Sequence, residues 1–104
     1  FFLEVQRFDQ KNEYESIIET LRLSAKSNVP VTATHPIQFE KREDYYFHEI
    51  RSCVSSKEEL DDINRELKFT REQYYKTKKE INELFKDIPS VISMSSQIAN
   101  MCNF

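Results

Sequence analysis

The sequence predicts an all-α protein of extended helices and coiled coil, and three features support that fold class. Glycine is absent from the 104 residues and only three prolines occur, so the tight-turn signals of a β-sandwich or barrel are scarce. Charged residues make up 32% of the chain against 38% hydrophobic ones, a composition that points to long helices. Apolar residues also recur at helical and heptad spacings. We expect a helix, a linker, a long helix and a short C-terminal helix.

The first expected element is an amphipathic helix over residues 1–27. Its apolar residues recur at spacings of three and four, which is the period of an α-helix. They are Phe1, Val5, Phe8, Tyr14, Ile17, Ile18, Leu21 and Ala25. A linker over 28–45 follows, because Pro30 and Pro36 disfavour a helix and leave the residues before them extended.

The strongest pattern spans residues 46–88, which we expect to form one long coiled-coil helix. Every seventh residue from Tyr46 to Ile88 lacks a formal charge, as the a positions of a coiled coil do. The series is Tyr46, Cys53, Leu60, Leu67, Tyr74, Ile81 and Ile88, and the d series adds Ile63 and Leu84. Such a helix measures on the order of 60 Å, more than so small a chain can bury against itself. Its apolar stripe therefore requires another chain.

The charges beside this stripe restrict how it can pair. Acidic or amide residues occupy the g positions and basic residues the e positions, so an antiparallel pair of identical chains would face like charges with like. A parallel pair and a different partner both remain open. Tyr74 favours a different partner, because two tyrosines in one layer of a symmetric dimer need room and hydroxyl partners. We therefore expect a hetero-oligomer.

A short apolar helix is expected over residues 89–104. Pro89 ends the long helix and Ser90 can cap the next one. The apolar residues Val91, Met94, Ile98, Met101 and Phe104 continue at helical spacing. The chain begins Phe1-Phe2-Leu3 without a methionine, which indicates a fragment of a longer protein.

Composition and spacing argue against an enzyme. Loops that cradle phosphate need glycine, and this chain has none. His48 is expected to be an exposed helix residue and Cys53 a small hydrophobic one. Cys53 and Cys102 show neither disulfide nor zinc spacing, which favours a reducing compartment. We expect no catalytic residue, no cofactor, no metal and no membrane segment.

The charge distribution bears on nucleic-acid binding. The net charge is −3, and acids and bases are mixed along the chain, so direct nucleic-acid binding is expected to be weak or absent. Lys76, Lys78 and Lys79, together with the tyrosines, leave an RNA-binding module as an alternative. Its affinity would fall steeply with salt.

Two segments resemble a known family. The segment Leu67-Lys68-Phe69-Thr70-Arg71-Glu72-Gln73-Tyr74, followed by Ile81, Glu83 and Leu84, is similar to the signature of THO complex subunit 7. Asn12-Glu13-Tyr14-Glu15 is similar to that family's glutamate-tyrosine motif. The resemblance covers residues 7–85.

The resemblance implies a non-catalytic nuclear subunit with a mechanical role. It would pair with THO subunit 5 in a coiled coil of the THO (TREX) complex, which couples transcription to mRNP packaging, mRNA processing and mRNA export. The partner-facing residues would be Leu60, Ile63, Leu67, Tyr74, Ile81, Leu84 and Ile88, with Tyr14, Ile18 and Leu21 as a second contact. The alternative is a coiled-coil scaffold subunit of another large complex, such as Mediator, a kinetochore, a nuclear pore or a membrane tether.

Overall fold

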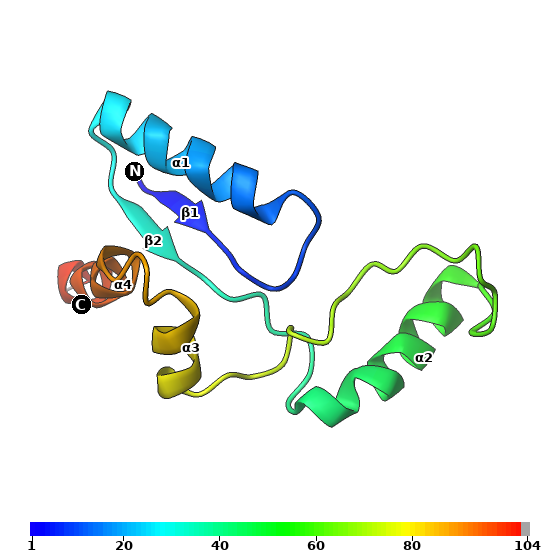
Figure 1. The fold of residues 1–104 in the computed structure, drawn as a ribbon. Coiled ribbons are helices and arrows are strands. Elements are labelled where there is room, and N and C mark those ends of the chain that lie inside the picture. Colours follow the sequence, from blue (N-terminus) through cyan, green and yellow to red (C-terminus); the bar gives the residue numbers. More distant parts are fainter. Residues whose placement is uncertain (103–104) are drawn as a thin grey trace. The chain divides into compact units, whose positions relative to one another are not determined.

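The computed structural model describes residues 1–102, and its chain divides into two compact units (Figure 1). Unit 1 consists of residues 1–35 together with the chain from residue 76 onwards. Unit 2 consists of residues 36–75. The chain thus leaves unit 1 after the first third of its length, forms unit 2, and returns to complete unit 1.

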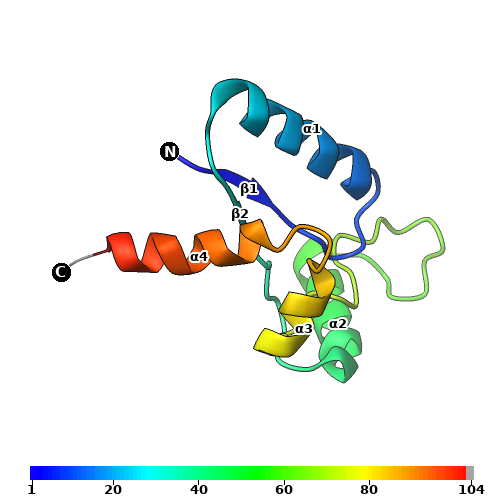
Figure 2. The same ribbon diagram turned by 60° about the vertical axis from the view of Figure 1, so that its left-hand side comes forward.

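Unit 1 is built on two short parallel strands joined by a helix. Strand β1 (Leu3–Val5) pairs with β2 (Val31–Ala33), with Leu3 opposite Val31. Helix α1 (Glu13–Ser27) connects the strands, because parallel neighbours need a crossover rather than a tight turn. Figures 1 and 2 both show α1 lying along the strand pair.

Two further helices complete unit 1. Helix α3 (Lys78–Leu84) starts at Thr77, whose hydroxyl accepts from the Glu80 N–H while the Glu80 carboxylate accepts from the Thr77 N–H. Helix α4 (Ser90–Met101) packs against β2. The buried core consists of Val5, Ile17, Val31, Phe85 and Val91, so each of the strands and α1, α4 and the α3–α4 connection contributes to it.

Unit 2 contains one regular helix and a long irregular segment. A short 3-10 turn, η1 (Arg42–Asp44), leads into α2 (Tyr45–Ser56), and residues 57–75 then run without a helix. The backbone N–H of Tyr75 donates to the Phe39 carbonyl oxygen at 3.0 Å, beside an isolated parallel bridge between Phe39 and Tyr74. This bridge brings the two ends of unit 2 together.

The prediction of an all-α coiled-coil fold is wrong, because the chain is mixed α/β. The helix expected over 1–27 occupies only Glu13–Ser27, since residues 3–5 form β1. The linker expected over 28–45 contains β2, whose β-branched residues suit a strand. Strands β1 and β2 are separated by more than 20 residues, so their pairing produces no local periodicity in the sequence.

The long helix expected over 46–88 is also wrong. Only Tyr45–Ser56 and Lys78–Leu84 are helical in that range. Helix α2 ends at Lys57, which has the left-handed conformation that closes a helix (φ 61°). Helix α4 lies within the range expected for the short apolar helix, 89–104, and Phe104 falls outside the described residues.

Candidate functional site

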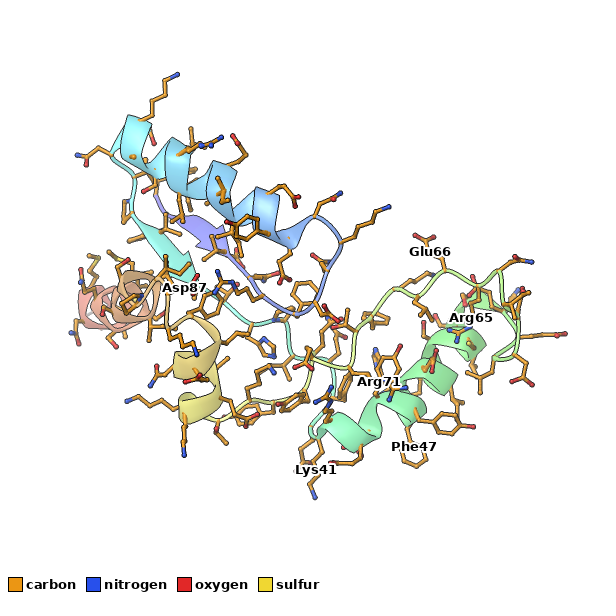
Figure 3. All side chains as sticks on the ribbon, viewed as in Figure 1. Lys41, Phe47, Arg65, Glu66, Arg71 and Asp87 are labelled. Atoms are coloured by element: carbon orange, nitrogen blue, oxygen red, sulfur yellow. The ribbon has the colours of Figure 1, made fainter. Side chains whose placement is uncertain are left out.

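An ion pair joins segments of unit 1 that are 80 residues apart in the sequence (Asp87 is labelled in Figure 3). The Arg7 guanidinium donates to the two carboxylate oxygens of Asp87 at 2.5 and 2.8 Å and to the Leu84 carbonyl oxygen at 2.9 Å. It lies 5.3 Å from the centre of the Phe85 ring. The hydrogen bond from Arg7 lowers the pKa of Asp87 to about 2. This contact fixes the segment after β1 to the α3–α4 connection.

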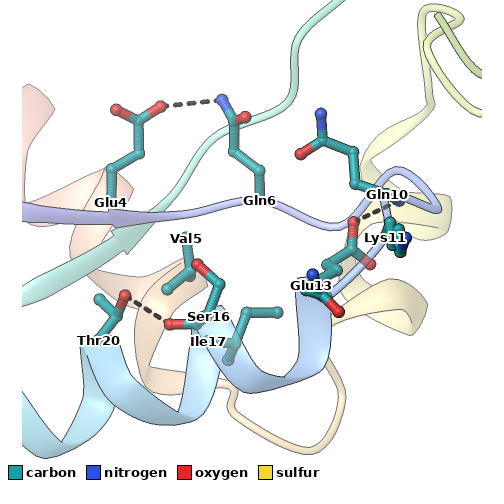
Figure 4. A pocket seen from close by; sticks show the side chains of 10 residues that line it. Glu4, Val5, Gln6, Gln10, Lys11, Glu13, Ser16, Ile17 and Thr20 are labelled. Carbon is teal, nitrogen blue, oxygen red and sulfur yellow. Dashed lines mark hydrogen bonds between the residues drawn. The ribbon is translucent and has the colours of Figure 1, made fainter. Parts of the chain in front are cut away.

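A hollow of about 500 Å³ lies beside the end of β1 and the start of α1 (Figure 4). The Gln6 amide donates to the Glu4 carboxylate at 3.0 Å and to the Thr34 hydroxyl at 2.8 Å, and that hydroxyl also donates to Glu4. The Glu13 carboxylate accepts the Phe8 backbone N–H at 2.8 Å. Because these polar groups bind one another and the backbone, they stabilise the edge of the sheet.

An aromatic cluster in unit 2 surrounds His48. The imidazole lies edge-on to Phe69 with ring centres 4.5 Å apart, and its centre is 5.5 Å from that of Phe39. Both ring nitrogens are buried and have no hydrogen-bond partner within residues 1–102. Burial lowers the pKa of His48, and the charge of Arg51 lowers it further. The sequence predicts an exposed helix residue at position 48, whereas the structure places His48 on α2 at a half-buried position.

Two arginines hold the irregular segment of unit 2 against α2 (both are labelled in Figure 3). Arg65 forms an ion pair with Glu49, and the two side chains are only 8% and 18% exposed. The Arg71 guanidinium lies 4.7 Å from the centre of the Tyr45 ring. The hydrogen bond to Glu49 raises the pKa of Arg65 above its ordinary value. These contacts replace the regular hydrogen bonds that a helix or sheet would supply.

A second hollow, of about 420 Å³, follows one face of α2. We call it the α2 hollow. It is lined on α2 by His48, Arg51, Ser52, Ser55 and Ser56, and on the irregular segment by Lys68 and Phe69. The α2 residues are spaced by three or four, so they share one side of the helix. The lining contains two cations and no acid, although the chain as a whole has a net charge of −3.

The ten residues predicted to face a partner are divided between the two units, six in unit 1 and four in unit 2. Four of them pack against the core of unit 1: Leu21, Ile81, Leu84 and Ile88. Two others lie on α1, where Tyr14 is 69% exposed and Ile18 is half-buried. For the four residues that pack against the core, the apolar spacing reports a core shared with two strands. A contact of Tyr14 and Ile18 with a partner stays a prediction.

The remaining four lie in unit 2, outside any helix. Leu60, Ile63, Leu67 and Tyr74 belong to the irregular segment 57–75. Ile63 and Leu67 are largely exposed, whereas Tyr74 forms the bridge with Phe39. A contact between these residues and a partner stays a prediction.

Neither a metal cluster nor a membrane span is found within residues 1–102. No group of three or more His, Cys, Asp and Glu side chains there has an arrangement that could hold a metal ion. No helix among those residues is long and apolar enough to cross a membrane. Cys53 is buried and Cys102 exposed, and both are free thiols.

Sequence reasoning missed the ion pairs and the His48 cluster. Arg7 and Asp87 are ordinary surface residue types, and nothing local in the sequence relates them. The signal that could have indicated the sheet is the β-branched pair Val31-Thr32 directly after Pro30. Recognition of that strand would have placed residues 1–35 in a strand–helix–strand unit.

The fold and these contacts define a mixed α/β segment in which one unit has a small apolar core and the other is held by polar and aromatic contacts. Over nearly its whole length this segment is similar to part of one bacterial protein, DNA polymerase III subunit alpha. It is 37% identical over 103 residues to that protein from Pseudomonas fluorescens, 36% over 103 residues to that from Pseudomonas aeruginosa, and 33% over 103 residues to that from Haemophilus influenzae. No family model matches the chain.

These matches are unequal in coverage. Each covers 99% of this chain but only 9% of the relative. The chain therefore spans less than a tenth of the length of the relatives it matches.

The relatives overturn the resemblance to THO complex subunit 7. A role in a THO (TREX) complex, in mRNA processing and mRNA export, and as a coiled-coil scaffold of another assembly is therefore wrong. THO subunit 5 is likewise wrong as the partner, and so is the expectation of weak or absent nucleic-acid binding. The relatives are bacterial proteins and bacteria have no nucleus, so the nuclear localisation is also wrong. The motif that suggested the family consists of residue types common on any charged, amphipathic segment.

Proposed function

We propose that this chain is a segment of a bacterial DNA polymerase III alpha-type subunit and serves DNA synthesis as part of that larger protein. The observation that carries the proposal is the similarity to such subunits, at 37% identity in the first of them, over 99% of the chain. Because the chain spans only 9% of that relative, the polymerase activity belongs to the proposal and not to the segment alone.

We further propose that the segment itself is structural and supplies no catalytic group. Asp87, whose pKa is lowered, is engaged with Arg7, and the largely buried ion pair of Arg65 with Glu49 joins α2 to the irregular segment. Such pairs position chain segments rather than substrate. The partners implied by the proposal are DNA and the other subunits of the polymerase.

A chimera tests the proposal. This chain replaces the matching 103 residues of the Pseudomonas aeruginosa subunit, and primer extension by the chimera is compared with that of the parent protein. We expect the chimera to retain primer extension. We expect the same chimera with Val91→Asp to lose it, because Val91 is 1% exposed in the core of unit 1 and an unpaired charge cannot be buried there.

Two controls separate the parts of the proposal. A folded chimera without primer extension would contradict the assignment to this class of subunit. Glu4→Gln and His48→Gln in the active chimera test the structural role. If either abolished primer extension while the protein stayed folded, the segment would contain a catalytic group.

A further inference from the structure

The α2 hollow combines features that suit an anion. Arg51 and Lys68 come from different parts of unit 2, α2 and the irregular segment, and line the same hollow of about 420 Å³. Neither forms a salt bridge within residues 1–102, whereas Arg42 and Arg65 of the same unit are paired with acids. Two unpaired cations facing one hollow repel each other, so their positions favour a negatively charged ligand between them.

Neutral donors are present beside these cations. The hydroxyls of Ser52 and Ser55 line the hollow and donate no hydrogen bond within the described chain. Ser56 is different, because its hydroxyl donates to the Ser52 carbonyl oxygen at 2.9 Å. The lining thus offers a guanidinium, an ammonium and two hydroxyls, and it contains no carboxylate that would repel an anion.

We propose that the α2 hollow binds a phosphate group, with Arg51 and Lys68 as the charged contacts and Ser52 and Ser55 as neutral donors. A phosphate presents several acceptor oxygens on one compact centre, and guanidinium and hydroxyl donors match that shape. A carboxylate has only two acceptor oxygens and a smaller charge, so it matches this donor set less well.

Two kinds of molecule could carry this phosphate group. The group belongs either to the backbone of DNA or to a small molecule that carries phosphate. Binding of the DNA backbone rests on the proposed function, because a DNA polymerase subunit contacts DNA. Binding of a small phosphate-bearing molecule does not depend on the proposed function. Phosphate recognition is common to both.

The experiment uses the full-length protein that contains this chain and two matched double variants. Arg51→Gln with Lys68→Gln removes both cations of the hollow. Arg22→Gln with Lys26→Gln removes two cations from α1 and changes the net charge equally. All four residues are exposed, so both variants are expected to fold, and circular dichroism checks this.

Two titrations are made on each protein. Calorimetry measures the binding of inorganic phosphate, and fluorescence anisotropy measures the binding of a labelled single-stranded oligonucleotide as the salt concentration is varied. For the hollow variant we expect phosphate binding weaker on the order of tenfold. We also expect the slope of log affinity against log salt to fall by about 0.7 for the oligonucleotide, the value for one lost phosphate contact.

The outcomes separate the two sources. A loss of both phosphate and oligonucleotide binding in the hollow variant supports DNA backbone as the ligand. A loss of phosphate binding alone supports a small phosphate-bearing molecule. If the hollow variant binds both as tightly as the α1 variant does, the hollow is no phosphate site and the proposal is overturned. Primer extension by the chimera is read independently, so failure here leaves the polymerase assignment standing.

Discussion

The two units of this chain are stabilised in different ways. Unit 1 has a sheet and a core of five buried apolar residues drawn from strands, helices and the α3–α4 connection. Unit 2 has one helix, and polar and aromatic side chains hold the irregular segment 57–75 against it. Truncation of a buried apolar side chain should therefore destabilise unit 1 most, whereas loss of a charge or a change in pH should destabilise unit 2.

The largest expected effect is on unit 1. Phe85 is 1% exposed in its core, and Phe85→Ala should lower the local free energy of unfolding by about 3–5 kcal/mol because it leaves a cavity. Amide hydrogen exchange of α1 and β2 in the full-length protein measures this loss. Phe47 is 65% exposed and projects away from α2 (Figure 3), so Phe47→Ala is the matched control. Equal losses in the two variants would contradict the assigned core.

In unit 2 the largest effect should come from the ion pair between Arg65 and Glu49. Arg65→Leu removes the partner of a carboxylate whose side chain is only 18% exposed, so the irregular segment should detach from α2. Faster proteolytic cleavage within residues 57–75 measures this. The rate of amide hydrogen exchange in unit 1 should stay unchanged.

Adding Glu49→Leu to Arg65→Leu should restore part of the lost protection, because no carboxylate is then left without a partner. Arg22 and Glu19 form an exposed pair on α1, with side chains 72% and 69% exposed, and its removal should cost no more than about 1 kcal/mol. A larger effect from the exposed pair would refute the contrast between them.

The units should also differ in their response to pH. The pKa of His48 is lowered in the folded state, so the unfolded chain binds the proton more tightly. The contribution of His48 to the stability of unit 2 is then fully present above pH 6.5 and is lost as the pH falls from 6.5 toward the lower folded-state pKa. Asp87 is lowered from 3.8 to about 2, so its contribution to unit 1 is lost only as the pH falls through 3.8 toward 2.

Hydrogen exchange at pH 7 and pH 5, corrected for the intrinsic exchange rate, checks this difference. Between these values unit 2 should lose protection while unit 1 keeps it. His48→Phe retains an aromatic ring between Phe39 and Phe69 and removes the titrating group, so the loss in unit 2 should disappear. A loss that persisted in this variant would have another titrating group as its cause.

The sequence predicted local features of the chain better than its long-range ones. Helix α4 begins at Ser90, close to where the sequence predicts a new helix, but its N-cap is Pro89 and not Ser90. Helix α3 already ends at Leu84, so Pro89 is not what ends it. The apolar spacing of Ile81, Leu84 and Ile88 reflected real packing, but these residues face the core of unit 1. A heptad pattern records which residues share a face and does not say what covers that face.

The α2 hollow was less predictable from the sequence than the fold. The spacing of His48, Arg51, Ser52 and Ser55 on one face of a helix can be read from the sequence. Lys68 is brought to that face by an irregular segment, and no periodicity predicts its course. The parallel pairing of Leu3 with Val31 is hidden for the same reason, since it depends on a crossover of more than 20 residues.

The smallest expected effect concerns a feature that both units share. A chain without glycine closes two helices with left-handed residues, Asn28 after α1 (φ 56°) and Lys57 after α2 (φ 61°). Lysine pays a steric cost in this conformation that asparagine largely avoids through its short polar side chain. Lys57→Gly should therefore stabilise unit 2 by about 1 kcal/mol, after allowance for the greater freedom of glycine in the unfolded chain.

Asn28→Gly is the matched change in unit 1 and should alter stability by no more than about 0.5 kcal/mol, because asparagine already tolerates the left-handed region. Hydrogen exchange at the last turns of α1 and α2 measures both effects. The Lys57 N–H donates to the Cys53 carbonyl oxygen, a bond that glycine keeps, so only the conformational cost changes. If Lys57→Gly weakened α2, the prediction would be contradicted. The lysine side chain would then itself stabilise unit 2, as the ion pair of Arg65 with Glu49 does.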